Sequence, residues 1–128
     1  MSSLRILVAD DEAGMRDWLT DVLEGCGHRV FAVKDGLEAK QLARRQPLDV
    51  MITDISMPNE EGLGIICALR IAHPGLKIIA MSGSNADALL DAKLLGASAA
   101  LTKPFTAEMV LDCVRDITRL RPADKLKP

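Results

Sequence analysis

The sequence alternates five times between a short apolar run and a helix-like segment, and this alternation limits what the chain can fold into. Within these runs polar residues do not alternate with apolar ones, which is typical of strands buried on both faces. The predicted strands are residues 4–9, 28–33, 49–53, 76–81 and 99–102. The predicted helices are residues 15–23, 37–46, 61–72, 86–95 and a last helix that begins near Thr106. Strands that alternate with helices predict an α/β fold, a doubly wound parallel sheet with helices on both faces.

The length and composition indicate one globular domain. A chain of 128 residues is long enough to bury a single core, and 48% hydrophobic with 27% charged residues is ordinary for such a domain. We expect the domain to span residues 1–120. Residues 121–128 are polar, contain two prolines and are expected to form a tail or linker.

The charge and the N-terminus exclude several classes of partner. A net charge of −2 and only three aromatic residues leave neither a basic surface nor stacking platforms for nucleic acid. The sequence contains no apolar run near the roughly 18 residues that a membrane span requires, and the first residues lack a signal-peptide pattern. Three widely spaced cysteines, Cys26, Cys67 and Cys113, are expected to be buried, reduced thiols rather than disulfide or metal ligands. These features favour a cytoplasmic protein.

Polar side chains follow four of the five predicted strands. Asp10 and Asp11 end the first strand, Asp54 the third, Ser82 the fourth and Lys103 the fifth. The carboxyl ends of parallel strands meet at one edge of the sheet, where ligands of doubly wound folds bind. We therefore expect these five side chains to lie together.

Such a group of side chains suits phosphoryl transfer. Three neighbouring carboxylates repel one another, and a hard divalent cation such as Mg²⁺, which prefers oxygen ligands, would compensate their charge. Lys103 supplies a cation for a phosphoryl oxygen, and Ser82 supplies a hydroxyl. Phosphoryl transfer depends mainly on positioning and charge neutralisation, which these groups offer.

Each residue also has a purely structural explanation. Asp11 could cap the first helix, and Asp54 could form an Asx-turn. Ser82 by itself is a loop residue, and Lys103 by itself is a strand end. Their expected convergence on one edge favours the functional interpretation.

Four segments in order carry a resemblance to a known family. They are residues 6–12 (ILVADDE), residues 54–58 (DISMP) with Gly62, residues 79–83 (IAMSG), and residues 96–97 leading to 103–105 (KPF). From about residue 4 to 119 the chain resembles the receiver domain of bacterial two-component response regulators, including chemotaxis regulators. The resemblance implies a flavodoxin-like sheet with strand order 2-1-3-4-5 and five helices.

The resemblance also implies a function. Asp54 would be the nucleophile that takes a phosphoryl group from the phosphohistidine of a sensor histidine kinase or a histidine phosphotransfer protein. The domain would catalyse only its own phosphorylation and dephosphorylation, and would switch a protein–protein interaction with a downstream target. Mg²⁺ would be held by the carboxylates of Asp11 and Asp54, by the backbone carbonyl of Ser56, and by Asp10 partly through water.

Two further positions take their roles from the resemblance. Lys103 would pair with the phosphoryl group, and a cis Lys103–Pro104 peptide would direct it into the pocket. The Ser82 hydroxyl would donate to a phosphoryl oxygen, and its movement would report the modification of Asp54 to the surface.

One position departs from the family pattern. Receivers usually carry Tyr or Phe a few residues before the lysine, whereas this sequence has Ala100. A methyl group cannot make the family's aromatic switch movement, although the phosphoryl chemistry should survive. We hypothesise that the output uses rearrangement of residues 82–86.

Three classes of function compete. The first is a stand-alone receiver, and the second is the receiver part of a larger regulator with an output domain such as a DNA-binding transcription factor. The third is a metal-dependent phosphatase on the same fold, disfavoured because such enzymes carry Asp-Xaa-Asp after the first strand rather than adjacent Asp10 and Asp11. A flavin-binding protein is disfavoured too, since no phosphate-binding loop follows the first strand. With no basic output domain in the sequence, we favour the single-domain interpretation.

Overall fold

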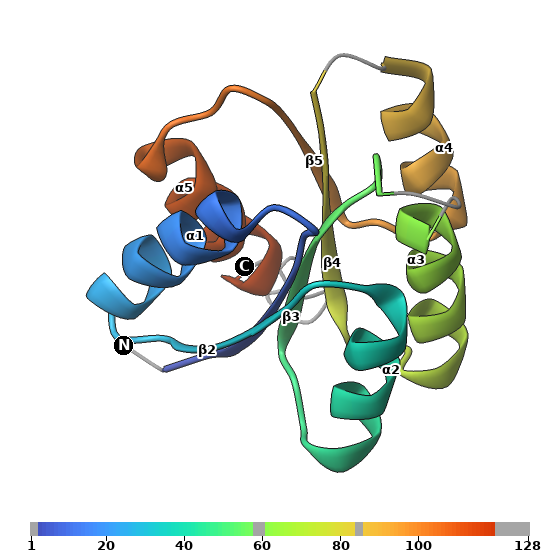
Figure 1. Cartoon of the computed structure of the whole chain (residues 1–128), viewed down its shortest axis with the longest axis horizontal. Coiled ribbons are helices and arrows are strands. Elements are labelled where there is room, and N and C mark those ends of the chain that lie inside the picture. Colours follow the sequence, from blue (N-terminus) through green and yellow to red (C-terminus); the bar gives the residue numbers. More distant parts are fainter. Residues whose placement is uncertain (1–2, 58–60, 84–85, 120–128) are drawn as a thin grey trace, which may run out of the picture.

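The computed structural model describes residues 3–57, 61–83 and 86–119, and in them five strands alternate with five helices (Figure 1). The strands are β1 (Arg5–Ala9), β2 (Arg29–Val33), β3 (Val50–Asp54), β4 (Lys77–Ser82) and β5 (Ala99–Thr102). The helices are α1 (Ala13–Gly25), α2 (Gly36–Arg45), α3 (Glu61–Ala72), α4 (Ala86–Leu95) and α5 (Ala107–Arg119). All ten predicted elements are confirmed, with most boundaries shifted by one or two residues. The predicted tail lies outside the described residues.

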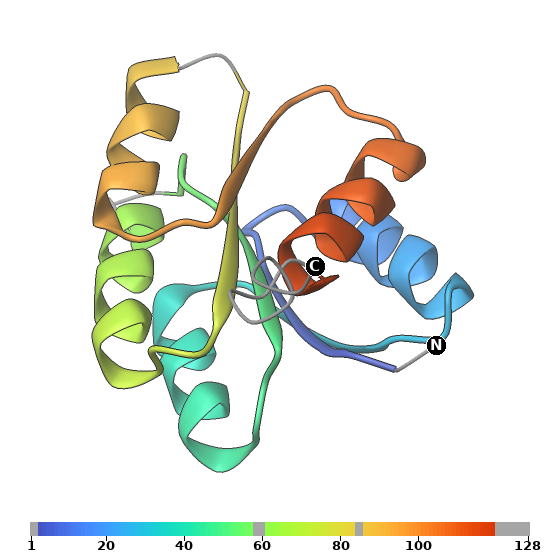
Figure 2. The same ribbon diagram turned by 180° about the vertical axis from the view of Figure 1, so that it is seen from behind.

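The five strands form one parallel sheet in the order β2-β1-β3-β4-β5. This is the doubly wound order that the family resemblance implied. Helices α1 and α5 cover one face of the sheet, and α2, α3 and α4 cover the other (Figures 1 and 2). The order reverses between β1 and β3, so the loops after these two strands open side by side.

Burial on both faces of the sheet explains why the strands are nearly continuous apolar runs in the sequence. The central strands β1, β3 and β4 are buried along nearly their whole length, whereas the edge strands β2 and β5 are partly exposed. Alternate residues serve two cores: Leu7 packs in the core under α2, α3 and α4, and Ile6 packs in the core under α1 and α5. A strand with apolar neighbours on both faces needs apolar residues at every position.

The start of α5 agrees with the prediction from the sequence, whereas the burial of the cysteines does not. The Thr106 hydroxyl accepts a hydrogen bond from the Met109 amide at 3.1 Å and so caps α5, which begins next to Thr106 as predicted. The prediction that all three cysteines are buried was wrong. Cys26 is exposed because it follows the last turn of α1, while Cys67 and Cys113 are half-buried; all three are free thiols.

None of the helices in the described part of the chain combines the length and the apolar character that a membrane span requires.

Candidate functional site

Three carboxylates converge where β1 and β3 end. Asp10 is fully buried, Asp54 is 5% exposed, and Asp11 is exposed to solvent. One oxygen from each carboxylate lies within 4.8 Å of the others. The predicted convergence of these residues is confirmed. Three closely spaced carboxylate oxygens with one open side suit a hard divalent cation that keeps part of its water shell.

The loop between β1 and α1 is held by backbone contacts. The Asp10 carboxylate accepts a hydrogen bond from the Glu12 amide at 2.9 Å, and the Arg16 guanidinium donates to the Asp10 carbonyl at 2.8 Å. Glu12, not Asp11, is the N-cap residue of α1, and it makes no side-chain cap bond. The structural explanation of Asp11 as a helix cap was therefore wrong. Arg16 was missed from the sequence because nothing in its spacing marks it as a partner of this loop.

Asp54 is held from two sides. Its Oδ1 accepts a hydrogen bond from the Ser56 amide at 2.7 Å, and its Oδ2 lies 3.0 Å from Lys103 Nζ. The first contact is an Asx-turn, so the structural explanation of Asp54 holds together with its place in the pocket. The two contacts fix the plane of the carboxylate.

Lys103 bridges the two buried carboxylates. Its Nζ lies 3.0 Å from Asp54 Oδ2 and 3.4 Å from Asp10 Oδ2, and its backbone amide donates to the Ser82 carbonyl at 2.7 Å. The Lys103–Pro104 peptide is cis, as the family resemblance implied.

Burial and the neighbouring charges together shift the pKa values of Lys103 and Asp10. Burial lowers the pKa of Lys103, but the hydrogen bond to Asp54 and the charges of Asp10 and Asp54 outweigh it, so the pKa is raised above 10.5. Burial is the largest cause of a raised pKa at Asp10, and it outweighs the Glu12 amide and the Lys103 charge, which lower the value. The Lys103 charge and the Glu12 amide thus do not offset the cost of burying the Asp10 carboxylate.

Ser82 offers a hydroxyl at the edge of the same pocket. The residue is fully buried at the end of β4, and its Oγ lies 3.5 Å from the Ser56 Oγ. This is a long contact for two hydroxyls, so the Ser82 hydroxyl can turn toward a stronger acceptor at little cost. The Ser56 hydroxyl is a neighbour that the sequence interpretation did not foresee.

Gly62, one of the residues that carried the resemblance, explains how α3 approaches the site. A Cβ atom at this position would lie 2.3 Å from the Ile55 Cα and 2.4 Å from the Asp54 carbonyl oxygen. Only glycine lets the start of α3 pack this closely on the chain that leaves Asp54.

Ala100 stands at the position where receivers usually carry the Tyr or Phe of the aromatic switch. Ala100 is half-buried in β5 and pairs with Ala80 of β4. An aromatic pair lies elsewhere: Trp18 of α1 contacts Phe105, two residues after Lys103, with ring centroids 5.9 Å apart. The hypothesis about residues 82–86 concerns in part positions 84 and 85, which lie outside the described residues.

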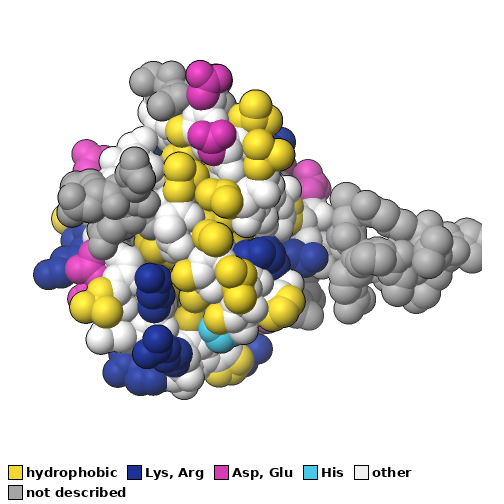
Figure 3. All heavy atoms as spheres, turned by 90° about the vertical axis from the view of Figure 1, so that its right-hand side faces the viewer, with side chains coloured by type: hydrophobic (Ala, Val, Ile, Leu, Met, Phe, Trp, Pro, Cys, Tyr) yellow, Lys and Arg dark blue, Asp and Glu magenta, His cyan; other side chains and the backbone are white. Residues whose placement is uncertain are grey.

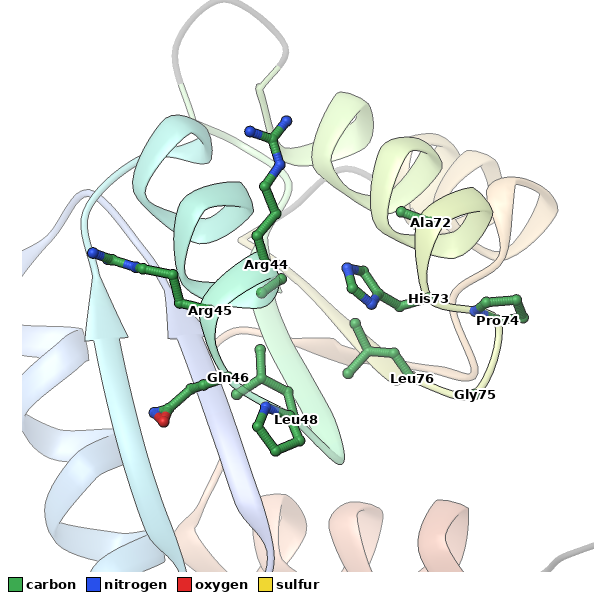
Figure 4. Close-up of a pocket in the computed structure, with 11 residues that line it drawn as sticks. Arg44, Arg45, Gln46, Leu48, Ala72, His73, Pro74, Gly75 and Leu76 are labelled. Atoms are coloured by element: carbon green, nitrogen blue, oxygen red, sulfur yellow. The ribbon is translucent and has the colours of Figure 1, made fainter.

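A separate pocket of about 560 Å³ lies at the opposite edge of the sheet, between the ends of α2 and α3 (Figure 4). Its lining includes Leu48 and Leu76, which precede β3 and β4, together with Arg45 and His73. It shares no residue with the carboxylate site.

At the other edge, the structure brings together the residues predicted for the site: Asp10, Asp11, Asp54, Ser56, Ser82 and Lys103. The roles assigned to them stay predictions.

Comparison with known proteins agrees with this geometry. The family model described as "Response regulator receiver domain" matches residues 6–115. Sporulation initiation phosphotransferase F of Bacillus subtilis is 26% identical over 122 residues, which cover 94% of this chain and 98% of that protein. The DNA-binding transcriptional regulator NtrC of Azospirillum brasilense is 35% identical over 115 residues, which cover 89% of this chain but 24% of that protein.

A solved structure gives the same result. The chemotaxis response regulator CheY4 of Vibrio cholerae superposes with a TM-score of 0.83 at 26% sequence identity, and the match covers 91% of this chain and 99% of that one. The relatives thus include proteins of similar length and proteins of which this chain spans about a quarter.

Proposed function

Because this chain belongs to the response regulator receiver domain family, we propose that Asp54 accepts a phosphoryl group from a phosphohistidine in a Mg²⁺-dependent reaction. The observation that carries the proposal is the contact pattern of Asp54, a nearly buried carboxylate held by Lys103 and the Ser56 amide beside two further carboxylates. Few other uses of a buried carboxylate require this combination of charges.

The proposed step is a displacement at phosphorus. An Asp54 carboxylate oxygen attacks, a P–O bond forms, and the P–N bond to the donor imidazole breaks. Lys103, already 3.0 Å from Asp54 Oδ2, then pairs with a phosphoryl oxygen. The buried Ser82 hydroxyl, which has only its long contact to Ser56 among the described residues, donates to another phosphoryl oxygen.

The carboxylates support the metal part of the proposal. Asp11 and Asp54 would hold Mg²⁺ through side-chain oxygens, Ser56 through its backbone carbonyl, and Asp10 through water. When bound, the ion neutralises charge that builds on the phosphoryl oxygens. Burial is the main cause of the raised pKa of Asp10, and the charge of Asp54 adds to it, so a bound cation would favour the ionised form of this carboxylate.

The partners follow from the family. A receiver takes its phosphoryl group from a sensor histidine kinase or a histidine phosphotransfer protein and acts on a downstream target. We propose a cytoplasmic role for this domain as a switch of protein–protein contacts, with no nucleic acid or membrane bound by the domain itself. The second candidate, the receiver part of a larger regulator, is supported by relatives such as NtrC, of which this chain matches 24%.

The proposal is tested by incubating the full chain with Mg²⁺ and a small-molecule phosphodonor, followed by intact-mass spectrometry. We expect one alkali-labile phosphoryl group on the wild type, none on Asp54→Asn, and no product when EDTA replaces Mg²⁺. Asp17→Asn, an exposed carboxylate of α1 outside the site, is the matched control and should be phosphorylated like the wild type. No mass gain at saturating donor would contradict the proposal.

A further inference from the structure

The loop between β1 and α1 carries two of the three carboxylates of the site, and the structure holds them in different ways. The Asp10 side chain is fully buried and accepts hydrogen bonds from Lys103 and from the Glu12 amide. Asp11 is exposed, and its carboxylate makes no hydrogen bond or ion pair with another described residue. One of its oxygens nevertheless lies within 4.8 Å of an oxygen of Asp10 and one of Asp54. Because these charges repel one another, the backbone of the loop must hold Asp11 in this place.

Arg16, at the end of the first turn of α1, closes the loop. Its amide donates to the Glu12 carbonyl at 3.1 Å, and its guanidinium Nη1 donates to the Asp10 carbonyl at 2.8 Å. Side chains of a helix lean toward its N-terminus, which explains why Arg16 reaches back over the loop. The Asp10 carbonyl and the Asp11 amide belong to one planar peptide group. A guanidinium that holds this carbonyl therefore fixes the peptide from which the Asp11 side chain departs.

The position of Arg16 argues against a role for its charge alone. The first turn of a helix carries partial positive charge, so a cation is disfavoured there. A positive side chain close to the carboxylates also opposes the binding of a metal cation. Arg16 is half-buried and forms none of the ion pairs between described residues. Its contact with the loop is a hydrogen bond from a charged donor, which is stronger than one between neutral groups.

We propose that Arg16 is a positioning residue, which holds the Asp11 carboxylate in the direction that lets it bind Mg²⁺. The inference rests on the proposed function, because Asp11 is a metal ligand only there. Arg16 acts through the backbone of the loop and is not itself a ligand, since a guanidinium offers no acceptor atom. Residues that orient a metal ligand from outside the ligand set commonly change the metal affinity by about 10–100-fold.

A positioning role and a role of charge alone predict opposite results for Arg16→Met. Isothermal titration calorimetry of the metal-free full chain with Mg²⁺ measures the dissociation constant. We expect Arg16→Met to raise it by about tenfold or more, because the loss of order at Asp11 outweighs the loss of a repelling charge. Arg16→Lys, which keeps a charged donor, should give an intermediate value. Arg44→Met, the same change at an exposed position at the opposite edge of the sheet, is the control and should leave the constant unchanged.

The order of the loop can be measured without the metal. ¹⁵N relaxation of the chain in EDTA gives an order parameter for each backbone amide. We expect the value at Asp11 to fall from about 0.85 in the wild type to below about 0.6 in Arg16→Met. The amides of Val8 in β1 and Leu19 in α1, which are fully buried, should keep their values. A loss confined to the loop distinguishes positioning of Asp11 from a general loss of structure.

Three results would overturn the role of Arg16. They are an unchanged or lower Mg²⁺ dissociation constant in Arg16→Met, an unchanged order parameter at Asp11, and a loss of order that extends to Val8 and Leu19. Failure of the proposed function is recognised separately, because the wild type itself would then bind no Mg²⁺ or take up no phosphoryl group. The measurement in EDTA would still show whether Arg16 fixes Asp11.

Discussion

At the scale of single residues, the site depends on contacts that the sequence reveals only in part. The positions of Asp10, Asp11, Asp54, Ser82 and Lys103 follow from one rule, that the carboxyl ends of parallel strands share an edge. Side-chain contacts with the backbone, such as that from Arg16 to the Asp10 carbonyl, depend on rotamers and loop geometry that no spacing rule contains.

Asp10 should destabilise the metal-free protein at neutral pH. Its folded-state pKa is raised above 3.8, so folding favours the protonated form, and the resulting stability is present below the unfolded-state pKa and lost as the pH rises through the folded-state value. In EDTA, Asp10→Asn should therefore unfold at a higher temperature than the wild type at pH 7. The difference should shrink as the pH falls toward 4. A lower melting temperature for Asp10→Asn in EDTA at pH 7 would contradict the predicted burial cost.

Gly62 should tolerate no side chain. The Cβ atom of Gly62→Ala would overlap the Asp54 carbonyl oxygen and the Ile55 Cα, so we expect a loss of about 2 kcal/mol or more in the free energy of unfolding. Gly64→Ala is the control in the same helix, since a Cβ there meets nothing within 4 Å. It should be neutral or stabilise by up to about 1 kcal/mol through helix propensity. Urea denaturation of both variants measures the difference, and equal stabilities would show that the close packing at Gly62 is unimportant.

At the scale of secondary structure elements, the sequence predicts best those strands that are buried on both faces. The apolar runs predict β1, β3 and β4 well because both faces of these strands are covered, and even the weakly amphipathic α4 was found with its observed bounds. Failures occur at the ends of elements. Cys26 looked buried among apolar neighbours, but α1 ends one residue before it, and a helix end is set by caps and loop contacts more than by hydrophobic pattern.

The contact between Trp18 of α1 and Phe105, which follows β5, should make the Trp18 fluorescence sensitive to phosphorylation of Asp54. Trp18, the one tryptophan of the chain, packs on Phe105, which is two residues from Lys103. We expect its fluorescence to change when Mg²⁺ and a phosphodonor are added, because Lys103 must leave Asp54 partly to pair with the phosphoryl group. Phe105→Leu should reduce this signal while phosphoryl uptake, measured by mass, persists. An unchanged signal in Phe105→Leu would exclude this contact as the reporter.

At the scale of the whole molecule, the site residues lie at one edge of the sheet, and the helices form the outer surfaces on its two faces. The sequence pattern predicted the parallel sheet with helices on both faces, because parallel strands, crossover helices and buried apolar runs obey few rules, whereas the strand order came from the family resemblance. It did not predict the exposed apolar side chains of α3 and α4 (Figure 3), since an apolar residue in a helix is assigned to the core unless the neighbouring helices are known. Ile71 and Leu94 are apolar like Ile66 and Leu69, and only packing separates them.

Metal binding should stabilise the whole fold through the carboxylates. A ligand that binds only the folded chain adds about 2.7 kcal/mol at a hundredfold excess over its dissociation constant. We expect Mg²⁺ to raise the melting temperature of the wild type in a concentration-dependent manner, and Asp11→Asn to lose most of this response. Asp11 is exposed, so the variant should fold normally. A response of Asp11→Asn equal to that of the wild type and of Asp17→Asn would remove Asp11 from the metal site.

The central claim, that Asp54 is the phosphoacceptor, is tested most directly by locating the phosphoryl group. Borohydride reduces an aspartyl phosphate to homoserine, so the full chain can be phosphorylated with Mg²⁺ and a phosphodonor, reduced, digested and sequenced by mass spectrometry. We predict homoserine at position 54, and none at positions 10 or 11. Homoserine at Asp10 or Asp11, or at no carboxylate although the intact protein gained a phosphoryl group, would contradict it.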